Sequence, residues 1–301
     1  MGLEEKSGGD APNDEPAERQ TTPFLVLQFF VFPMSIVAVC VAVFVIFGLI
    51  ASDRKTPRDY LAEVRTGGGL FNVKRWQAAF ALANALGSEK DLEKTDPQFG
   101  LDLVKLFEES RDDDPRVRRY LALSMGRLGD PRVVPALRKV LQDEEAGRDA
   151  ETLIYSIWAL GVLGDPTAEP DLLRLAQSDD AGIRKTAVHS LGAFPSAHAR
   201  SALVKAVGDP AADVRWNAAV ALGHRRDPAG TPVLLQMLDR ASLASVPGIT
   251  PDQQEAALLE AVAAAGASGD PALRPALESL REKDPSLKVR EAARKALEAR
   301  T

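Results

Sequence analysis

The chain has few of the residues that build disulfides, metal sites and nucleophilic catalytic centres. Its 301 residues include one cysteine, Cys40, and three histidines. A single cysteine excludes disulfides within the chain and thiolate metal sites. No two histidines are four residues apart on a predicted helix, and no Gly-x-Ser-x-Gly segment presents a nucleophile. The sequence therefore predicts no catalytic residue, no metal and no cofactor, and we expect the chain not to be an enzyme.

Aromatic residues and excess positive charge are also scarce. Aromatic side chains make up 6% of the sequence and hydrophobic residues 45%, a balance typical of helical stacks rich in alanine and leucine. The net charge is −6, of which residues 1–23 carry −4 and the rest of the chain −2. The bulk of the chain thus lacks the basic field of a general nucleic-acid-binding protein, and we expect no nucleic acid among its partners.

One long stretch has no charge at all. From Gln20 to Ser52 there is no Asp, Glu, Lys or Arg, and Phe29–Ile50 alone would form a helix of about 33 Å, the hydrocarbon thickness of a bilayer. The pattern predicts a transmembrane helix over 23–51 that contacts lipid through Phe29–Ile50. A cleaved signal peptide is one alternative, but it would have a basic start and a shorter apolar core. A buried core helix is the other, but one that is apolar on all sides over six turns would need a large domain around it.

The flanking cations predict the orientation of this helix. Only Arg19 lies close on its N-terminal side, whereas four cations follow it, and such a bias places the following side in the cytoplasm. We therefore expect a single-pass protein of a bacterial inner membrane, with its N-terminus outside and its C-terminal part in the cytoplasm. Residues 1–22 are predicted to be a disordered acidic tail, and residues 52–71 a linker with a short helix. The four cations are Arg54, Lys55, Arg58 and Arg65.

Residues 72–301 repeat one pattern. The glycines Gly126, Gly161, Gly192 and Gly223 follow one another at 35, 31 and 31 residues, and Gly266 repeats the pattern 43 residues later. We interpret them as turn glycines between the two helices of each repeat. Such spacing is typical of stacked helix pairs, and it predicts an all-α solenoid of about six pairs. Val289-Arg290 and Leu297 begin a further unit that stops after one helix.

Each unit has the same internal order. An Asp-Pro or Asp-Asp lead-in precedes a hydrophobic-Arg pair, as at Asp209-Pro210 and Val214-Arg215, and apolar residues at helical spacing then fill one side of a first helix. After Gly and Asp comes a second helix with a proline near its start, where a missing N–H is tolerated. These residues resemble HEAT repeats, and in particular the short bacterial HEAT-like repeats of the phycobilisome-lyase type.

The resemblance covers residues 72–301 and implies architecture more than activity. It allows a tetrapyrrole (bilin) lyase or isomerase, although nothing in the sequence marks a chromophore pocket. A nucleic-acid-binding HEAT protein is a further alternative, against which the charge balance argues. Our main expectation is a membrane-anchored scaffold or adaptor, or an accessory subunit of a membrane complex. Its partner would be another, membrane-associated protein, bound by a curved surface rather than by a reactive group, and the oligomeric state stays open.

Two sets of charged residues are the candidate functional positions. The first recurs once per unit, and we expect its arginines to pair with turn aspartates of neighbouring units in a stacking ladder, each pair contributing little alone. The second lies on the second helices, which in HEAT-like stacks line the concave side, and is the candidate partner face. The ladder consists of Arg118, Asp130, Asp165, Arg184, Arg215, Asp227, Asp270 and Arg290, and the partner face of Arg138, Lys139, Arg174, Arg200 and Lys205.

Overall fold

A computed structural model describes residues 31–51, 55–67, 75–87, 92–112, 114–143 and 149–298. The predicted tail, residues 1–22, lies outside them. The chain divides into two compact units, Met1–Lys55 and Thr56–Thr301. Every regular element within the described ranges is helical, as the repeat pattern predicts.

The first unit contains one described helix, α2 (Phe32–Ala51). Its sequence carries no charge, and large apolar side chains such as Phe32, Met34 and Phe44 are exposed. Among the described residues, no helix has the length and hydropathy of a membrane span. The side chains of Pro33 and of residues 47–51 lie outside the description. The membrane anchor therefore stays a prediction.

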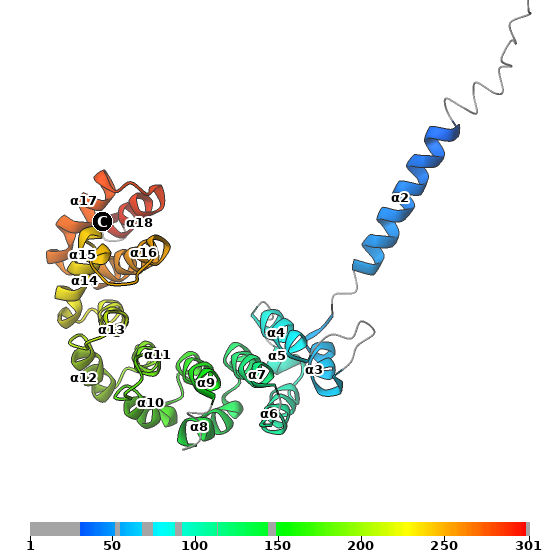
Figure 1. The fold of residues 1–301 in the computed structure, drawn as a ribbon, viewed down its shortest axis with the longest axis horizontal. Helices are drawn as coiled ribbons and strands as arrows, with labels where there is room; N and C mark the ends of the chain where they lie inside the picture. Colours follow the sequence, from blue (N-terminus) through cyan, green and yellow to red (C-terminus); the bar gives the residue numbers. More distant parts are fainter. Residues whose placement is uncertain are drawn as a thin grey trace, which may run out of the picture. The chain divides into compact units, whose positions relative to one another are not determined.

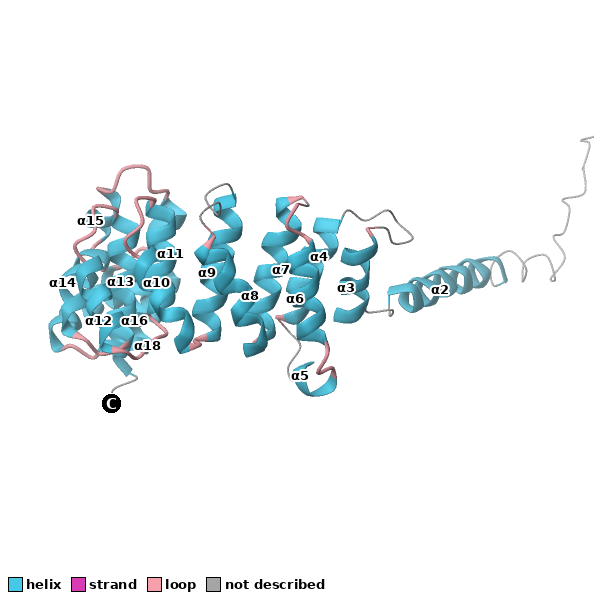
Figure 2. Ribbon diagram, turned by 90° about the horizontal axis from the view of Figure 1, so that it is seen from below, coloured by secondary structure: helices cyan, strands magenta, loops and turns pink. Residues whose placement is uncertain are grey.

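The second unit is a stack of antiparallel helix pairs that bends into an arc (Figure 1). The pairs follow a short entry helix, and a single helix ends the stack, as the incomplete last repeat predicts. Helices run across the stack, so that the connecting loops gather along its two edges (Figure 2). The entry helix is α3 (Pro57–Thr66); the pairs are α4 (Arg75–Leu86) with α6 (Phe99–Glu109), α7 (Pro115–Leu128) with α8 (Val134–Gln142), α9 (Ala150–Leu163) with α10 (Glu169–Leu175), α11 (Ala181–Leu191) with α12 (Ala197–Ala206), α13 (Ala212–His224) with α14 (Thr231–Met237), and α16 (Pro251–Ser268) with α17 (Arg274–Lys283); α18 (Leu287–Glu298) ends the stack, and the short helices α5 (Leu92–Thr95) and α15 (Arg240–Ala244) lie in connections.

The first helices form the inner layer of the arc and the second helices form the outer layer (Figure 1). Neighbouring first helices pack closely against one another along the whole stack, whereas neighbouring second helices barely touch. The more closely packed layer has the shorter arc, and it is therefore the concave one. This corrects the expectation that the second helices line the concave side.

The repeat glycines cause the close approach of the inner layer. Gly126, Gly161 and Gly223 lie inside first helices rather than in turns, which corrects their assignment as turn glycines. A Cβ on Gly161 would lie 2.5 Å from the Cβ of Ser190, and one on Gly126 would lie 2.9 Å from the Cα of Ala159. Real side chains do not tolerate such distances, so glycine lets each first helix contact the backbone of the next.

Other glycines end the first helices. Gly129, Gly164 and Gly269 have φ of 75°, 63° and 72°, the left-handed conformation that glycine adopts without steric cost. An aspartate follows each of them and caps the next 3-10 turn by accepting a hydrogen bond from a backbone N–H, for example from Arg132 to Asp130 at 2.9 Å. Sequence features of the repeat thus set both ends of its helices.

Two hydrophobic core clusters lie between the two layers, one from Leu61 to Leu222 and one from Ala219 to Ala293. They are built mainly from Leu, Ala and Val, and the largest fully buried side chains are Phe99, Phe107 and Phe194. Burial at about 25 cal/mol per Å2 of apolar surface makes this core the main source of stability. The core fills the space between the layers. The faces of the first helices that point away from the core line the concave side of the arc, and the candidate site lies there.

Candidate functional site

Aromatic rings follow one another along the inner layer. Phe80 on α4, Tyr120 on α7 and Tyr155 on α9 contribute one ring each, with centroids 5.2 Å and 6.4 Å apart in edge-to-face geometry. Phe80 is 45% exposed, and the two tyrosines are half-buried. Such rings offer a large apolar surface, to which the tyrosines add a polar tip, and aromatic side chains are enriched where proteins bind ligands and partners. We call these three residues the aromatic row.

Next to the aromatic row, the inner layer is hollowed. Two adjoining hollows of about 420 and 430 Å³ run over α9, α11, α13 and α16 and share Trp158, His189 and Asn217. Together they form the concave groove. Its wall consists of residues of first helices together with Gly192 and Ala193 directly after α11, which places it on the inner face of the arc. The other side chains named below as part of the groove are Leu123, Tyr155, Val220, His224 and Glu260.

Two neighbouring first helices fix the ring of His189. The Asn217 amide donates a hydrogen bond to the carbonyl oxygen of Asp213 at 2.7 Å, which leaves the Oδ1 of Asn217 as an acceptor. The Nδ1 of His189 lies 3.2 Å from that oxygen. A neutral imidazole in this arrangement carries its proton on Nδ1 and keeps Nε2 as an acceptor. His189 is exposed, so that a ligand in the groove can reach the ring.

Trp158 owes its place to the packing of the inner layer. A Cβ on Gly126 would lie 2.9 Å from Cζ3 of the Trp158 ring. The glycine at this position of α7 therefore leaves the space that the indole occupies. Trp158 is half-buried and forms part of both hollows. The groove therefore offers an indole face beside an imidazole, with the carboxylate of Glu260 and a second imidazole, His224, further along.

This set of side chains is suited to a flat, largely apolar ligand with polar edges. Aromatic faces stack on planar groups, and an imidazole can accept or deliver a proton near neutral pH. Within the described residues, no three His, Cys, Asp or Glu side chains gather in a way that could hold a metal ion.

The repeated arginines tie down their own loops. Nη1 of Arg184 donates to the carbonyl oxygens of Ser178 and Asp179 at 2.9 Å each, and Nη1 of Arg215 donates to the carbonyl oxygens of Asp209 and Pro210 at 2.8 and 2.9 Å.

Arg290 binds its loop in the same way, whereas Arg118 does not. Arg290 donates to the carbonyl oxygen of Asp284 at 2.7 Å. Arg118 instead lies over the Phe107 ring at 5.0 Å, and its Nε is buried without a hydrogen-bond partner. Burial lowers the pKa of the Arg118 guanidinium.

The predicted ladder pairs differ from those that the described residues form. Arg184 does bridge to the next unit, but to its lead-in Asp209, with Nε–Oδ2 at 2.9 Å, and not to a turn aspartate. The turn aspartates Asp130, Asp165, Asp227 and Asp270 each accept from a backbone N–H of the turn that follows. Their role at the start of the second helix explains why they recur.

Three of the five predicted partner-face cations hold neighbouring repeats together. Arg138 pairs with Asp171 at 2.8 Å, Arg200 pairs with Asp227 at 2.5 Å, and Arg174 donates to the carbonyl oxygen of Leu141 at 2.5 Å. Lys139 and Lys205 are exposed on α8 and α12. All five lie on second helices, and therefore on the outer layer. The structure does not bring them together with the groove.

The sequence interpretation did not identify the groove, although a signal was present. Tyr155, Trp158 and Val162 lie on one face of α9 at helical spacing, but this spacing alone does not distinguish a core face from an exposed one. His189 lies on α11 next to Val188 and Leu191. Both of these are buried, whereas His189 points away from them.

Comparison with known proteins agrees with the architecture. The family model for HEAT repeats matches residues 145–213 and 190–247, and that for the PBS lyase HEAT-like repeat matches residues 117–143. A search of curated proteins finds no match. Within residues 117–247, the chain thus matches HEAT-like repeats.

Solved structures show the same fold. The complex of CpcE and CpcF of phycocyanin lyase from Nostoc sp. PCC7120 is 20% identical over 82% of this chain and 88% of that chain, with a TM-score of 0.57. Human deoxyhypusine hydroxylase is 22% identical over 79% and 88% of the two chains, but its TM-score of 0.35 is too low to carry an argument.

These findings correct one expectation. The sequence lacks a nucleophile elbow, a histidine pair and cysteine ligands, and from this we expected the chain not to be an enzyme. That expectation is wrong, because a phycocyanin lyase complex has a similar fold and one repeat matches the PBS lyase type. The missing motifs belong to other enzyme classes, and their absence says nothing about a HEAT-like lyase.

Proposed function

We propose that this HEAT-like repeat protein binds a planar, conjugated ligand of the tetrapyrrole class in its concave groove and acts as a subunit of a lyase-type complex. The observation that carries the proposal is the presence of Trp158, His189 and Asn217 on three successive first helices around one groove. An indole can stack on a conjugated ring system, and Nε2 of His189 can accept a proton or hydrogen bond from a pyrrole N–H.

The groove is open along one side, so a second protein would have to cover the ligand. Small-molecule sites usually bury most of the ligand surface, which this inner face alone does not do. The similar phycocyanin lyase structure is a complex of two proteins, and we propose that this chain also works with a partner subunit. The partner would lie along the inner layer.

A titration with biliverdin tests the proposal. We expect saturable quenching of tryptophan fluorescence and a shift of the biliverdin absorbance. Trp158→Leu should weaken binding about tenfold, because a stacked ring contributes roughly 1–3 kcal/mol. Trp216→Leu is the matched control, since Trp216 lies on α13 outside the groove. Absence of saturable binding by the wild type, or equal loss in both variants, would contradict the proposal.

A protein-binding scaffold is the second candidate function. The aromatic row favours it, because Phe80 and Tyr120 continue the exposed aromatic surface over α4 and α7, away from the groove. A chain segment of a partner could follow the arc over several repeats. A protein that co-purifies with the wild type and with Lys139→Ala, but not with Tyr120→Ala, would support this function. Recovery of the same protein with Tyr120→Ala would argue against it.

We also propose that the N-terminal region anchors the chain in a bacterial inner membrane, with the solenoid in the cytoplasm. Support comes from the charge-free stretch 20–52 and from the cations that follow it. In a Cys40→Ser background, a cysteine engineered at Thr301 should resist an impermeant thiol reagent in intact cells and react after lysis. The chain should sediment with membranes after a carbonate wash. Labelling in intact cells would reverse the orientation, and release by carbonate would exclude the anchor.

A further inference from the structure

One residue breaks the rule by which the first helices end. Gly129, Gly164 and Gly269 stand directly before a turn aspartate, each in the left-handed conformation. At the corresponding position before Asp227 the chain has Arg226, with φ of 58°. Among the described residues, Arg226 alone combines a side chain with a positive φ.

The turn itself gives no reason for an arginine here. The N–H of Arg226 donates to the carbonyl oxygen of Gly223 and that of Asp227 donates to Leu222, both at 2.9 Å, a pattern that closes helix ends in which glycine is usual. An L-residue in this conformation is strained because its Cβ crowds the carbonyl oxygen. Such an outlier points to a role for the side chain outside the local fold.

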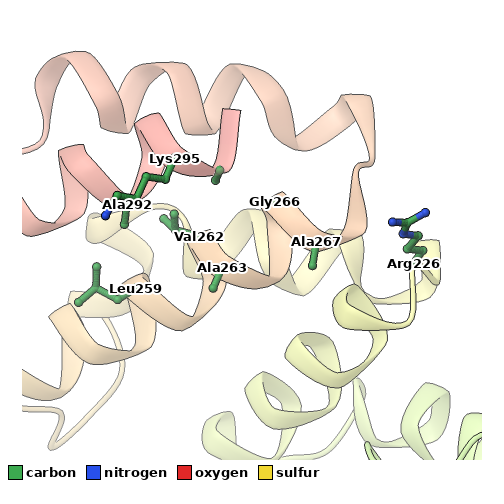
Figure 3. A pocket seen from close by; sticks show the side chains of 9 residues that line it. Arg226, Leu259, Val262, Ala263, Gly266, Ala267, Ala292 and Lys295 are labelled. Atoms are coloured by element: carbon green, nitrogen blue, oxygen red, sulfur yellow. The ribbon is translucent and has the colours of Figure 1, made fainter. Parts of the chain in front are cut away.

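The side chain of Arg226 stands at the edge of a third hollow in the inner layer (Figure 3). This hollow has a volume of about 810 Å³ and lies over α16 and α18. Its floor consists of small apolar residues, with Lys295 on the far side of the floor from Arg226 (Figure 3). The floor residues are Leu259, Val262, Ala263, Gly266, Ala267, Ala292 and Ala296.

The third hollow adjoins the concave groove. Ala263 belongs to the wall of both, and His224, in the groove, lies two residues before Arg226 at the end of α13. Arg226 is exposed, and no carboxylate within the described part of the chain pairs with its guanidinium. A ligand that extends from the groove past Ala263 therefore meets an apolar floor with an available guanidinium at its edge.

We propose that Arg226 is the carboxylate-binding residue of this site and receives an acidic side chain of the ligand whose ring system lies in the concave groove. The inference rests on the proposed function, because tetrapyrroles of the bilin type carry carboxylates on flexible arms. A guanidinium presents a planar fork of N–H donors that matches a carboxylate in two parallel hydrogen bonds. The alanine floor would accommodate the apolar part of the arm.

Biliverdin and its dimethyl ester test the assignment, because esterification removes the charge and keeps the ring system. Wild-type protein should bind the acid about fivefold more tightly than the ester, the value of a partly exposed ion pair. Arg226→Gly should bind both compounds equally, and Arg226→Lys should retain a preference for the acid. Lys139→Ala, on the outer layer, should leave the preference unchanged.

A thermal unfolding measurement separates this role from a structural one. If Arg226 is strained, Arg226→Gly should raise Tm by about 2 °C while it removes the acid preference. A lower Tm for this variant would show that the side chain supports the fold and would overturn the assignment. Equal binding of acid and ester by the wild type would overturn the role of Arg226 alone, whereas binding of neither compound would overturn the proposed function with it.

Discussion

The inner and outer layers of this solenoid are held together by different interactions. First helices contact one another through glycine and alanine, as where Gly161 faces Ser190, whose hydroxyl donates to the carbonyl oxygen of Ile157 at 3.0 Å. Second helices stand apart and are linked by ion pairs, such as Arg138 with Asp171 and Arg200 with Asp227. Close packing shortens the inner layer and bends the stack, while long side chains span the wider outer gaps. The curvature that shapes the groove follows from this difference.

The largest effect is expected from a methyl group in the inner layer. Gly161→Ala places a Cβ 2.5 Å from the Cβ of Ser190 and 2.8 Å from its Cα, so that α9 and α11 must separate. We expect a loss of about 3 kcal/mol in the free energy of unfolding, measured by urea denaturation. Gly208→Ala is the control, because its nearest neighbour would be 3.6 Å away, and it should change stability by less than about 0.5 kcal/mol. Equal stability of the two variants would mean that the inner layer does not depend on glycine.

A smaller effect is expected from a buried ion pair of the outer layer. Asp284 is almost fully buried and pairs with Arg240 at 2.6 Å. Burial acts to raise the pKa of Asp284, but the hydrogen bonds from Arg240 and from the Ser286 amide outweigh it and lower the pKa. Asp284→Asn should reduce the free energy of unfolding by about 2 kcal/mol at pH 7. Asp252→Asn, at an exposed site on α16, should change it by less than about 0.5 kcal/mol.

The same variant has a defined pH dependence. Because the pKa of Asp284 is lower in the folded than in the unfolded chain, its contribution is complete above about pH 4 and is lost as the pH falls through the folded pKa. The stability difference between wild type and Asp284→Asn should therefore narrow below about pH 4. If the stability difference stays constant down to about pH 2.5, the negative charge of Asp284 does not stabilise the fold.

The smallest effect on stability is expected from two arginines that occupy the same position in different repeats. Arg184 pairs with Asp209 through two hydrogen bonds, whereas Nε of Arg118 is buried without a partner. Arg184→Met should lose about 1.5 kcal/mol, because Asp209 keeps its charge in a poorly exposed position. Arg118→Met should change stability by less than about 0.5 kcal/mol, since methionine fills a similar volume beside Phe107. Equal losses would indicate that packing of the arginine side chain, and not the ion pair with Asp209, sets the contribution of this repeat position.

The fold could be predicted because its signals are local. The glycine spacing, the hydrophobic-Arg pairs and, in several units, the Gly-Asp-Pro segments recur along the chain, and they coincide with helix contacts, loops and caps. The resemblance to HEAT repeats follows from these residues. The incomplete last unit, with Val289-Arg290 on α18, was predicted in the same way.

The site could not be predicted, because it depends on which layer is concave. A periodic sequence gives the phase of the repeat but not the direction in which the stack bends. That direction depends on contacts between residues about 30 apart, such as Gly161 with Ser190. Because the second helices were expected on the concave side, Arg138 and Arg200 were assigned to a partner face. In the structure they link neighbouring repeats on the outer layer.

Hydrogen exchange with and without biliverdin tests most directly the claim that the inner layer carries the site. The account predicts that the ligand slows exchange in α9, α11, α13 and α16, and that it leaves exchange in α8, α10, α12 and α14 unchanged. Protection centred on the second helices, or no protection anywhere at a saturating ligand concentration, would contradict it.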